Sequence, residues 1–163
     1  RMDYRPLKDG LQLIPKVGMR MRIPAEYSQV SWYGRGPHEN YPDRKSGYFI
    51  GQYSMPLDEF IFDYASPQDN ANRCDTRWFS LGNGSRDIEI HGLQELNFRA
   101  WPYGEEDLEG SAHPFDIPAR DFINVNIDFK IHGVGGNDGW GARTMDAYTI
   151  DPAQPYSFGF IIR

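Results

Sequence analysis

The sequence predicts an all-β fold, and three observations support this class. The chain of 163 residues is rich in aromatic side chains, with 4 Trp, 10 Tyr and 10 Phe. It also contains 17 Gly and 12 Pro, a mixture that favours short strands and turns over long helices. Short apolar or alternating segments bounded by Gly, Pro, Asn and Asp recur along the chain, as in sandwiches and barrels. We therefore expect one β domain over residues 1–163.

Several segments have the composition of strands. They are residues 18–23, 29–33, 49–53, 76–81, 88–91, 96–101, 122–131, 147–150 and 156–163. The clearest is 122–131, where Phe122, Asn124, Asn126, Asp128 and Lys130 alternate with apolar residues. This pattern predicts one apolar and one mostly polar face. The final segment, YSFGFIIR, is aromatic and β-branched and is expected to pack on a neighbouring strand.

Turn and helix signals are few. Asn83-Gly84 lies between two strand-like runs, which is a good hairpin signal. One helix is predicted at residues 105–112, because its first turn is acidic and His113-Pro114 follows it. No repeat, low-complexity tract or linker divides the chain.

Charge and hydropathy exclude two classes of partner. The net charge is -6 and the basic residues are scattered among acids, so no nucleic-acid surface is expected and neutral or small-molecule partners fit better. No apolar run approaches the roughly 18 residues of a membrane span, so no membrane partner is expected. Cys74 is the only cysteine, which rules out an internal disulfide and leaves the compartment open.

The run WYGRGPHENYPDR, residues 32–44, is the most distinctive segment. Gly34 and Gly36 suit a backbone that turns tightly where side chains would clash, and Pro37 fixes φ at the exit. This combination predicts a shaped, rigid loop.

Catalytic residues do not stand out. A glycosidase needs two carboxylates about 5 to 10 Å apart, and spacing alone cannot select a pair among 23 acids. The nominees are Glu39, Asp128, Asp138 and Asp146. Acids on turns and strand edges are the commoner case, so we predict no catalytic residue.

No metal site is expected either. The isolated histidines, which are expected to be structural and hydrogen-bonded, are His38, His91, His113 and His132. Cys74 precedes Asp75, which raises a thiol pKa, and is predicted to be a small buried residue.

The segment HGVGGNDGWG, residues 132–141, is the strongest binding candidate. It does not fit a phosphate cradle, because no helix pattern or Lys-Ser/Thr pair follows it. Trp140, flanked by Gly139 and Gly141, either exposes its indole face, on which the apolar face of a pyranose ring stacks, or fills the core. The residues alone favour neither alternative.

Two further polar-aromatic groups are less specific. Arg73, Arg77 and Trp78 form one group, and Trp32, Tyr33 and Tyr41 form the other. The default expectation is buried arginine bonded to loop carbonyls or carboxylates.

Five motifs occur in an order that resembles a known family. They are IPKVGMRM, WYGRGPHENYPDR, SPQDNANRCDTRW, YGEEDLEGSAHPFDIPARD and GVGGNDGW. Together they resemble the small-chain, or C-terminal domain 5, region of bacterial family 2 glycoside hydrolases that are β-galactosidases. The resemblance implies an antiparallel supersandwich similar to galactose mutarotase. The chain looks shorter than that domain and enters a turn-like stretch at residues 6–10 soon after Arg1, so we expect an incomplete copy from a longer chain.

The resemblance also assigns roles. The family's catalytic glutamates and its magnesium and sodium sites belong to a barrel domain, so no cofactor is expected in this chain. Trp140 matches the tryptophan that stacks on the aglycone sugar, and Asn137 and Asp138 match the turn that presents it. Six further matching residues are expected to be architectural and to hold the loop in place by hydrogen bonds and an ion pair. They are Pro37, Glu39, Asn40, Tyr41, Asp43 and Arg44. Residues 51–62 match no family feature.

The first functional hypothesis is therefore the C-terminal part of a bacterial β-galactosidase that hydrolyses terminal β-D-galactosides, from the cytoplasm or the periplasm. Its partners would be the galactoside, the rest of the polypeptide and further copies of the parent enzyme. The alternatives are a stand-alone carbohydrate-binding module and a purely structural domain.

Overall fold

Antiparallel strands dominate the structure, a computed structural model that describes residues 1–8, 10 and 12–163. The strands are β1 (Met2–Tyr4), β2 (Lys16–Pro24), β3 (Gln29–Gly36), β4 (Phe49–Pro56), β5 (Arg73–Gly82), β6 (Asp87–Trp101), β7 (Phe122–Ile131), β8 (Tyr156–Phe158) and β9 (Phe160–Ile162). The helices are α1 (Leu57–Phe60), α2 (Glu105–Gly110) and the short 3-10 helices η1 (Pro114–Asp116) and η2 (Asp146–Tyr148). The predicted all-β class is confirmed.

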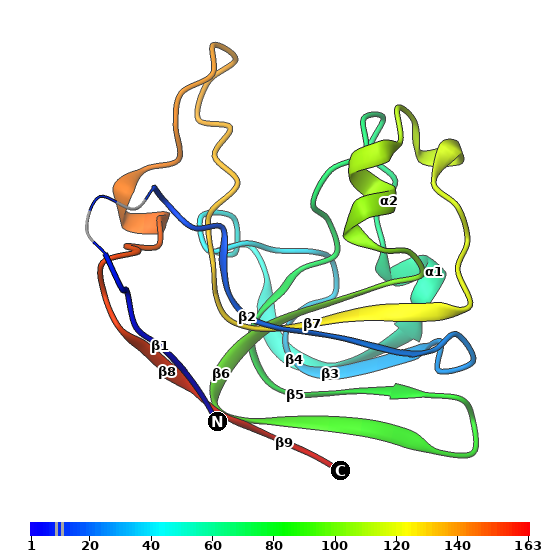
Figure 1. Cartoon of the computed structure of the whole chain (residues 1–163). Coiled ribbons are helices and arrows are strands. Elements are labelled where there is room, and N and C mark those ends of the chain that lie inside the picture. Colours follow the sequence, from blue (N-terminus) through cyan, green and yellow to red (C-terminus); the bar gives the residue numbers. More distant parts are fainter. Residues whose placement is uncertain (9, 11) are drawn as a thin grey trace.

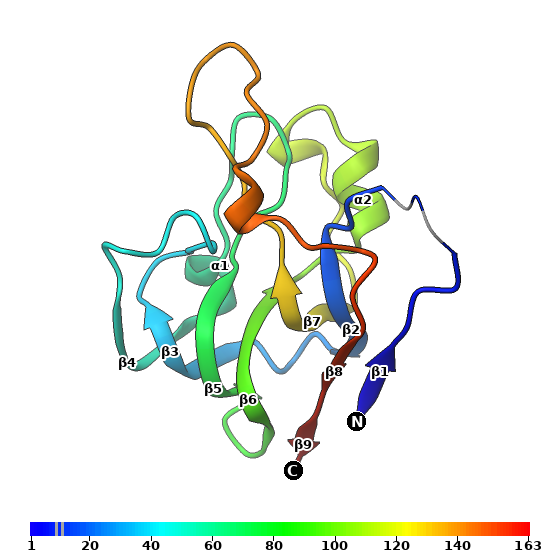
Figure 2. The same ribbon diagram turned by 90° about the vertical axis from the view of Figure 1, so that its left-hand side faces the viewer.

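One large sheet carries the fold. Its strand order is β2-β7-β6-β5-β3-β4, with β9 added to β6, and every pairing is antiparallel. β1 and β8 form a separate two-stranded ribbon. Figures 1 and 2 show α2 and the loop after β7 rising on the same side of the sheet. None of the described helices has the length and apolar character needed to cross a membrane.

The centre of the core is aromatic. Trp32, Phe60, Phe79 and Phe98 are each at most 1% exposed. The rings of Phe79 and Phe98 stack 4.1 Å apart at 8°, and Trp32 meets Phe60 edge to face. Each such side chain contributes roughly 1.5–3 kcal/mol through burial, so these four rings hold β3, β5, β6 and α1 together.

Most predicted strands are confirmed, but two predictions are wrong. Residues 88–91 and 96–101 belong to one continuous strand, β6, because its start pairs with β9, its end pairs with β7, and β5 runs along the other edge. Residues 147–150 form no strand. There the backbone forms η2, and the Tyr148 carbonyl accepts from the Gly133 amide instead of a neighbouring strand.

The polar face predicted for β7 is present, and its three central residues are buried. Asn124, Asn126 and Asp128 are 0%, 5% and 2% exposed, respectively. The reason is that β7 lies between β2 and β6 and is covered by α2, whose Glu105 accepts a hydrogen bond of 3.3 Å from Asn126 Nδ2. The alternation of polar and apolar residues in β7 therefore corresponds to a polar layer that is buried under α2.

The turn and helix predictions are confirmed with small changes. The hairpin joins β5 to β6 through residues 83–86, where Gly84 has a φ of +83° and Asn83 Oδ1 accepts from the Ser85 and Arg86 amides. The predicted helix is α2, which ends at Gly110. Of the predicted turn at residues 6–10, residue 9 lies outside the described residues.

The glycines of the WYGRGP run lie in β3 and not in turns, which corrects the predicted loop start. A Cβ on Gly34 would lie 2.6 Å from Thr76 Oγ1, and one on Gly36 would lie 2.7 Å from the Tyr53 ring. The absence of side chains is therefore needed for close strand packing. The loop itself begins after the cis peptide bond between Gly36 and Pro37.

We expect Gly34→Ala to destabilise the chain by about 2 kcal/mol, because the new methyl group also meets the Thr76 backbone at 2.9 Å and the sheet must shift. The matched control is Gly47→Ala, where nothing lies within 4 Å of the added Cβ. Urea unfolding of both variants measures the difference. Equal midpoints for the two variants would contradict close packing at Gly34.

Candidate functional site

Trp140 is the most exposed aromatic side chain of the structure. It is 94% exposed and belongs to the loop of residues 132–145 that follows β7, named here the Trp140 loop. The loop projects away from the sheet (Figure 1, orange), and its tip stands clear of other segments in the second view (Figure 2). The alternative in which Trp140 fills the core is therefore excluded, and its indole face is available to a ligand.

The tip of the Trp140 loop is shaped by its own side chains. Asp138 Oδ1 accepts from the backbone amides of Trp140, at 2.8 Å, and of Ala142, at 3.1 Å. These amide hydrogen bonds hold the pKa of the Asp138 carboxyl below its usual range. Asn137 Nδ2 lies 3.2 Å from Met145 Sδ across the loop. Asn137 and Asp138 thus form the turn before Trp140, and their contact with a sugar stays a prediction.

The base of the Trp140 loop is fixed from a distant part of the chain. Asp43 Oδ1 accepts from the Val134 amide at 3.1 Å, and Asp43 Oδ2 accepts from the Gly135 amide at 2.7 Å. Thr144 Oγ1 closes the loop by donating to the Gly133 carbonyl at 3.2 Å. An architectural role for Asp43 was predicted, but its partner was not, because no local sequence signal joins positions about ninety residues apart.

Residues 37–48, named here the anchor segment, follow β3 and carry Asp43. Arg44 Nη2 pairs with Glu39 Oε1 at 2.6 Å, and Glu39 Oε2 accepts from the Ala71 amide at 2.7 Å. Tyr41 Oη donates to Asp69 Oδ1 at 2.9 Å. The predicted pinning of this segment by hydrogen bonds and an ion pair is confirmed.

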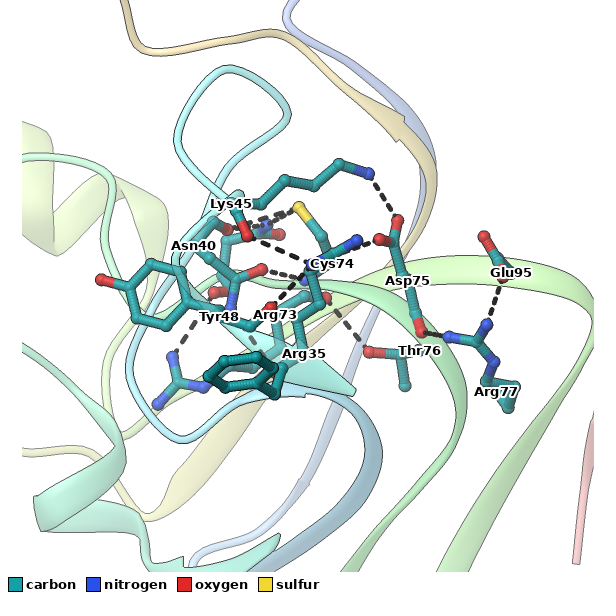
Figure 3. A network of polar contacts seen from close by, with 12 residues as sticks. Arg35, Asn40, Lys45, Tyr48, Arg73, Cys74, Asp75, Thr76, Arg77 and Glu95 are labelled. Carbon is teal, nitrogen blue, oxygen red and sulfur yellow. Dashed lines mark hydrogen bonds and ion pairs between the residues drawn. The ribbon is translucent and has the colours of Figure 1, made fainter. Parts of the chain in front are cut away.

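Figure 3 shows a second set of contacts between the anchor segment and β5. Asn40 Oδ1 accepts from the Cys74 amide at 2.8 Å, and Lys45 Nζ pairs with Asp75 Oδ1 at 2.7 Å. Arg35 Nε pairs with the other oxygen of Asp75 at 2.5 Å, and Arg35 Nη1 donates to the Tyr48 carbonyl at 2.6 Å. The Lys45 and Arg35 contacts hold the pKa of Asp75 low although burial opposes them.

Arg73 is the buried arginine that the sequence predicted. It is 1% exposed and donates to the carbonyls of Pro37 at 3.0 Å, Ala71 at 3.0 Å and Phe60 at 3.3 Å. Burial lowers its pKa to about 9, so the guanidinium stays charged at neutral pH. Arg77 differs, because it is half-buried and pairs with Glu95 at 2.5 Å.

Cys74 has no reactive environment. Burial raises the pKa of its thiol to about 12, and the charge of Asp75 adds to this shift. The prediction of a small buried residue is confirmed, and the thiol is a poor nucleophile.

A second polar region lies between β2, β6 and α2. Lys16 Nζ pairs with Asp69 Oδ2 at 2.7 Å, and Arg99 pairs with both Asp69 and Glu105. The Arg99 guanidinium lies 3.7 Å from the centre of the Trp101 ring. Two open cavities of about 300 and 330 Å³ flank the Lys16–Asp69 pair. This cluster could not be predicted from the sequence, because its members come from four separate segments.

Two carboxyls in and beside this cluster have pKa values shifted in opposite directions. Burial raises the pKa of Asp128 to about 7, whereas Arg99 and Lys16 outweigh burial and keep the pKa of Asp69 low. Such divergence suits an acid and a base. However, Asp128 is only 2% exposed and lies directly against the Gly18 backbone, so a sugar cannot reach it. We interpret Asp128 as a structural group.

The other nominated acids and the histidines are dispersed. Glu39 pairs with Arg44, Asp138 binds amides of its own loop, and Asp146 opens η2. The histidine contacts are separate, and they join His91 to Glu89, His113 to Asp116 and His132 to the Gly133 carbonyl. In the part of the chain that the structure describes, no three potential metal ligands gather.

The aromatic group of Trp32, Tyr33 and Tyr41 forms no common surface. Trp32 and Tyr41 are at most 1% exposed, whereas Tyr33 is 36% exposed. Among the predicted ligand-facing residues, only Trp140 offers an open aromatic face.

Comparison with known proteins identifies the relatives of the chain. Residues 1–162 match the family described as beta galactosidase small chain. The chain is 36% identical to a β-galactosidase of Priestia megaterium over 92% of the chain and 15% of the relative's length. It is 33% identical to that of Halalkalibacterium halodurans over 99% and 16%, and 37% identical to that of Vibrio cholerae over 92% and 14%. The chain thus spans about one seventh of the curated relatives that it matches.

We expect Asp128→Asn to remove a pH dependence of stability. The folded-state pKa of Asp128 is raised to about 7, so the folded chain keeps a proton that the unfolded chain has lost above pH 4. This group therefore makes the wild type less stable as pH rises from about 4 to 7, by on the order of 3 kcal/mol.

Denaturant unfolding at pH 5 and pH 8 compares the wild type with Asp128→Asn. The variant should gain stability relative to the wild type at pH 8. A constant difference between the two proteins over this range would contradict the neutral buried carboxyl.

Proposed function

Since this chain belongs to the β-galactosidase small-chain family, we propose that it works as the C-terminal part of an enzyme that hydrolyses terminal β-D-galactosides. In this proposal, residues 1–163 form one β-sandwich domain of that enzyme. Its relatives are named β-galactosidases, and each is about seven times longer than the matched segment. The chain would supply one wall of the substrate pocket and not the reacting groups.

The exposure of Trp140 is the observation that carries this proposal. A tryptophan that is 94% exposed on a loop braced at both its tip and its base is positioned for a ligand outside the domain. Its flat apolar face suits the C–H face of a pyranose ring. We propose that Trp140 stacks on the aglycone sugar beyond the scissile bond, with Asn137 and Asp138 shaping the turn that presents it.

The remaining parts of the site would come from elsewhere in the longer polypeptide. The acid/base and nucleophile glutamates, with the magnesium and sodium ions, would lie in a barrel domain, and this chain would contact that domain. We propose a homo-oligomeric parent enzyme that binds neither nucleic acid nor membrane, consistent with the net charge of -6.

Trp140→Ala in the full-length enzyme should raise KM for lactose roughly tenfold with little change in kcat, because stacking binds ground and transition states alike. A galactoside with a small aglycone should be unaffected. The control is Phe115→Ala, which removes an aromatic side chain that is 83% exposed on η1. Unchanged lactose kinetics in a folded Trp140→Ala enzyme would reject the aglycone role.

The isolated chain should be inactive, because the reacting glutamates are proposed to lie in a barrel domain outside residues 1–163. The measurement is hydrolysis of a chromogenic galactoside by the highly purified 163-residue chain, with the full-length enzyme as the positive control. Galactoside hydrolysis that co-purifies with the chain would contradict the proposal that the reacting groups lie outside it.

A second candidate function is that of a stand-alone carbohydrate-binding module, and the exposed Trp140 favours it equally. It predicts heat on mixing the purified chain with lactose, galactose or oligosaccharides at millimolar concentration, and loss of that heat in Trp140→Ala. Calorimetry without heat for the wild-type chain would remove this candidate and leave the pocket-wall role.

A further inference from the structure

We propose that Asp43 is a positioning residue for Trp140: its carboxylate fixes the base of the Trp140 loop, and through it the affinity for the aglycone. This inference rests on the proposed function above. It assigns to the acidic residue of the YPDR motif a role in substrate preference, although Asp43 itself touches no sugar.

The contact is specific to a carboxylate. Each of the two carboxylate oxygens of Asp43 accepts one hydrogen bond from a backbone amide, that of Val134 at 3.1 Å and that of Gly135 at 2.7 Å. Hydrogen bonds to an ionised acceptor are about twice as strong as neutral ones. Gly133 allows this approach, because a Cβ there would lie 2.6 Å from Asp43 Oδ2.

The carboxylate is held in place by its own segment. Residues 41–44 form a tight turn, in which the Arg44 amide donates to the Tyr41 carbonyl at 2.8 Å. Tyr41 is bonded to Asp69, and Arg44 is paired with Glu39, on either side of Asp43. Asp43 is therefore a fixed point on the body of the domain, and the Trp140 loop is the part that it restrains.

The Trp140 loop needs such a restraint because its own backbone is permissive. Gly135, Gly136 and Gly141 all have positive φ values, a region in which glycine moves freely. Besides the Asp43 contacts, separate hydrogen bonds hold the base of the loop, from the His132 amide to the Pro15 carbonyl and from the Gly133 amide to the Tyr148 carbonyl, both at 2.8 Å. Loss of both carboxylate bonds would let the indole occupy many positions, and stacking requires one.

The test is a double-mutant cycle in the full-length enzyme with Asp43→Ala and Trp140→Ala. Asp43→Ala should raise KM for lactose roughly threefold to tenfold, leave kcat nearly unchanged and leave a small-aglycone galactoside unaffected. In the Trp140→Ala background, Asp43→Ala should add nothing to KM, because it acts through the missing indole.

Three companion variants define the contact. Asp43→Asn keeps one acceptor oxygen and should fall between the wild type and Asp43→Ala. Gly133→Ala disturbs the same contact from the loop side and should raise KM for lactose in the same selective way. The matched control is Asp121→Ala, which removes an exposed acid elsewhere and should leave both substrates unaffected.

Hydrogen exchange provides a readout independent of activity. The Val134 and Gly135 amides should exchange faster in Asp43→Ala than in the wild type. Unchanged exchange, or an equal rise of KM in the Trp140→Ala background, would overturn the proposal. If Trp140→Ala itself leaves lactose kinetics unchanged, the proposed function fails and the positioning role fails with it. Faster amide exchange would then show that the contact exists and that only the stacking is wrong.

Discussion

The buried guanidinium of Arg73 is the constraint on which the placement of the anchor segment, and through it of the Trp140 loop, depends. A charge removed from water must be fully bonded, and Arg73 finds its partners in the Pro37, Ala71 and Phe60 carbonyls. Those three carbonyls belong to three different segments, so satisfying one side chain fixes how the segments meet. Asn40 and Asn72 hold the same segments together. The backbone amide of Asn40 donates to the backbone carbonyl of Asn72, and the side-chain Nδ2 of Asn72 donates to the backbone carbonyl of Asn40.

Starting from these Arg73 contacts, each segment fixes the position of the next one. The sheet and the Arg73 contacts place the anchor segment, the anchor segment places Asp43, and Asp43 places the base of the Trp140 loop. Each step rests on directional hydrogen bonds, which satisfy the polar groups of an irregular backbone and so keep it in one conformation. A loop can thus project far from the core and still present an aromatic ring at a defined place.

The sequence predicted what depends on local chemistry and failed where distant segments meet. Aromatic and β-branched runs located the strands, and Asn83-Gly84 located the hairpin. Periodicity could not show that the polar face of β7 is buried, because α2 and its Glu105 cover that face. Arg73 was predictable as a buried arginine, whereas the link from Asp43 to Gly135 was not, because neither residue carries a signal about the other. The exposure of Trp140 could not be predicted from the sequence, because tryptophan occurs both in cores and on binding surfaces.

The separation between Asp43 and its partners also sets an order of events during folding. The two carboxylate bonds join positions 91 and 92 residues apart, so neither bond can form until β4, β5, β6 and β7 have brought the chain back to the anchor segment. Contacts of long sequence separation incur their entropic cost before they contribute energy, and they form late. Strands β2 and β7 pair over a still longer separation, from Lys16 to Ile131 and from Pro24 to Phe122. The surface that would face the sugar and the β2 side of the sheet therefore both wait for the same late step, the return of the chain through β7.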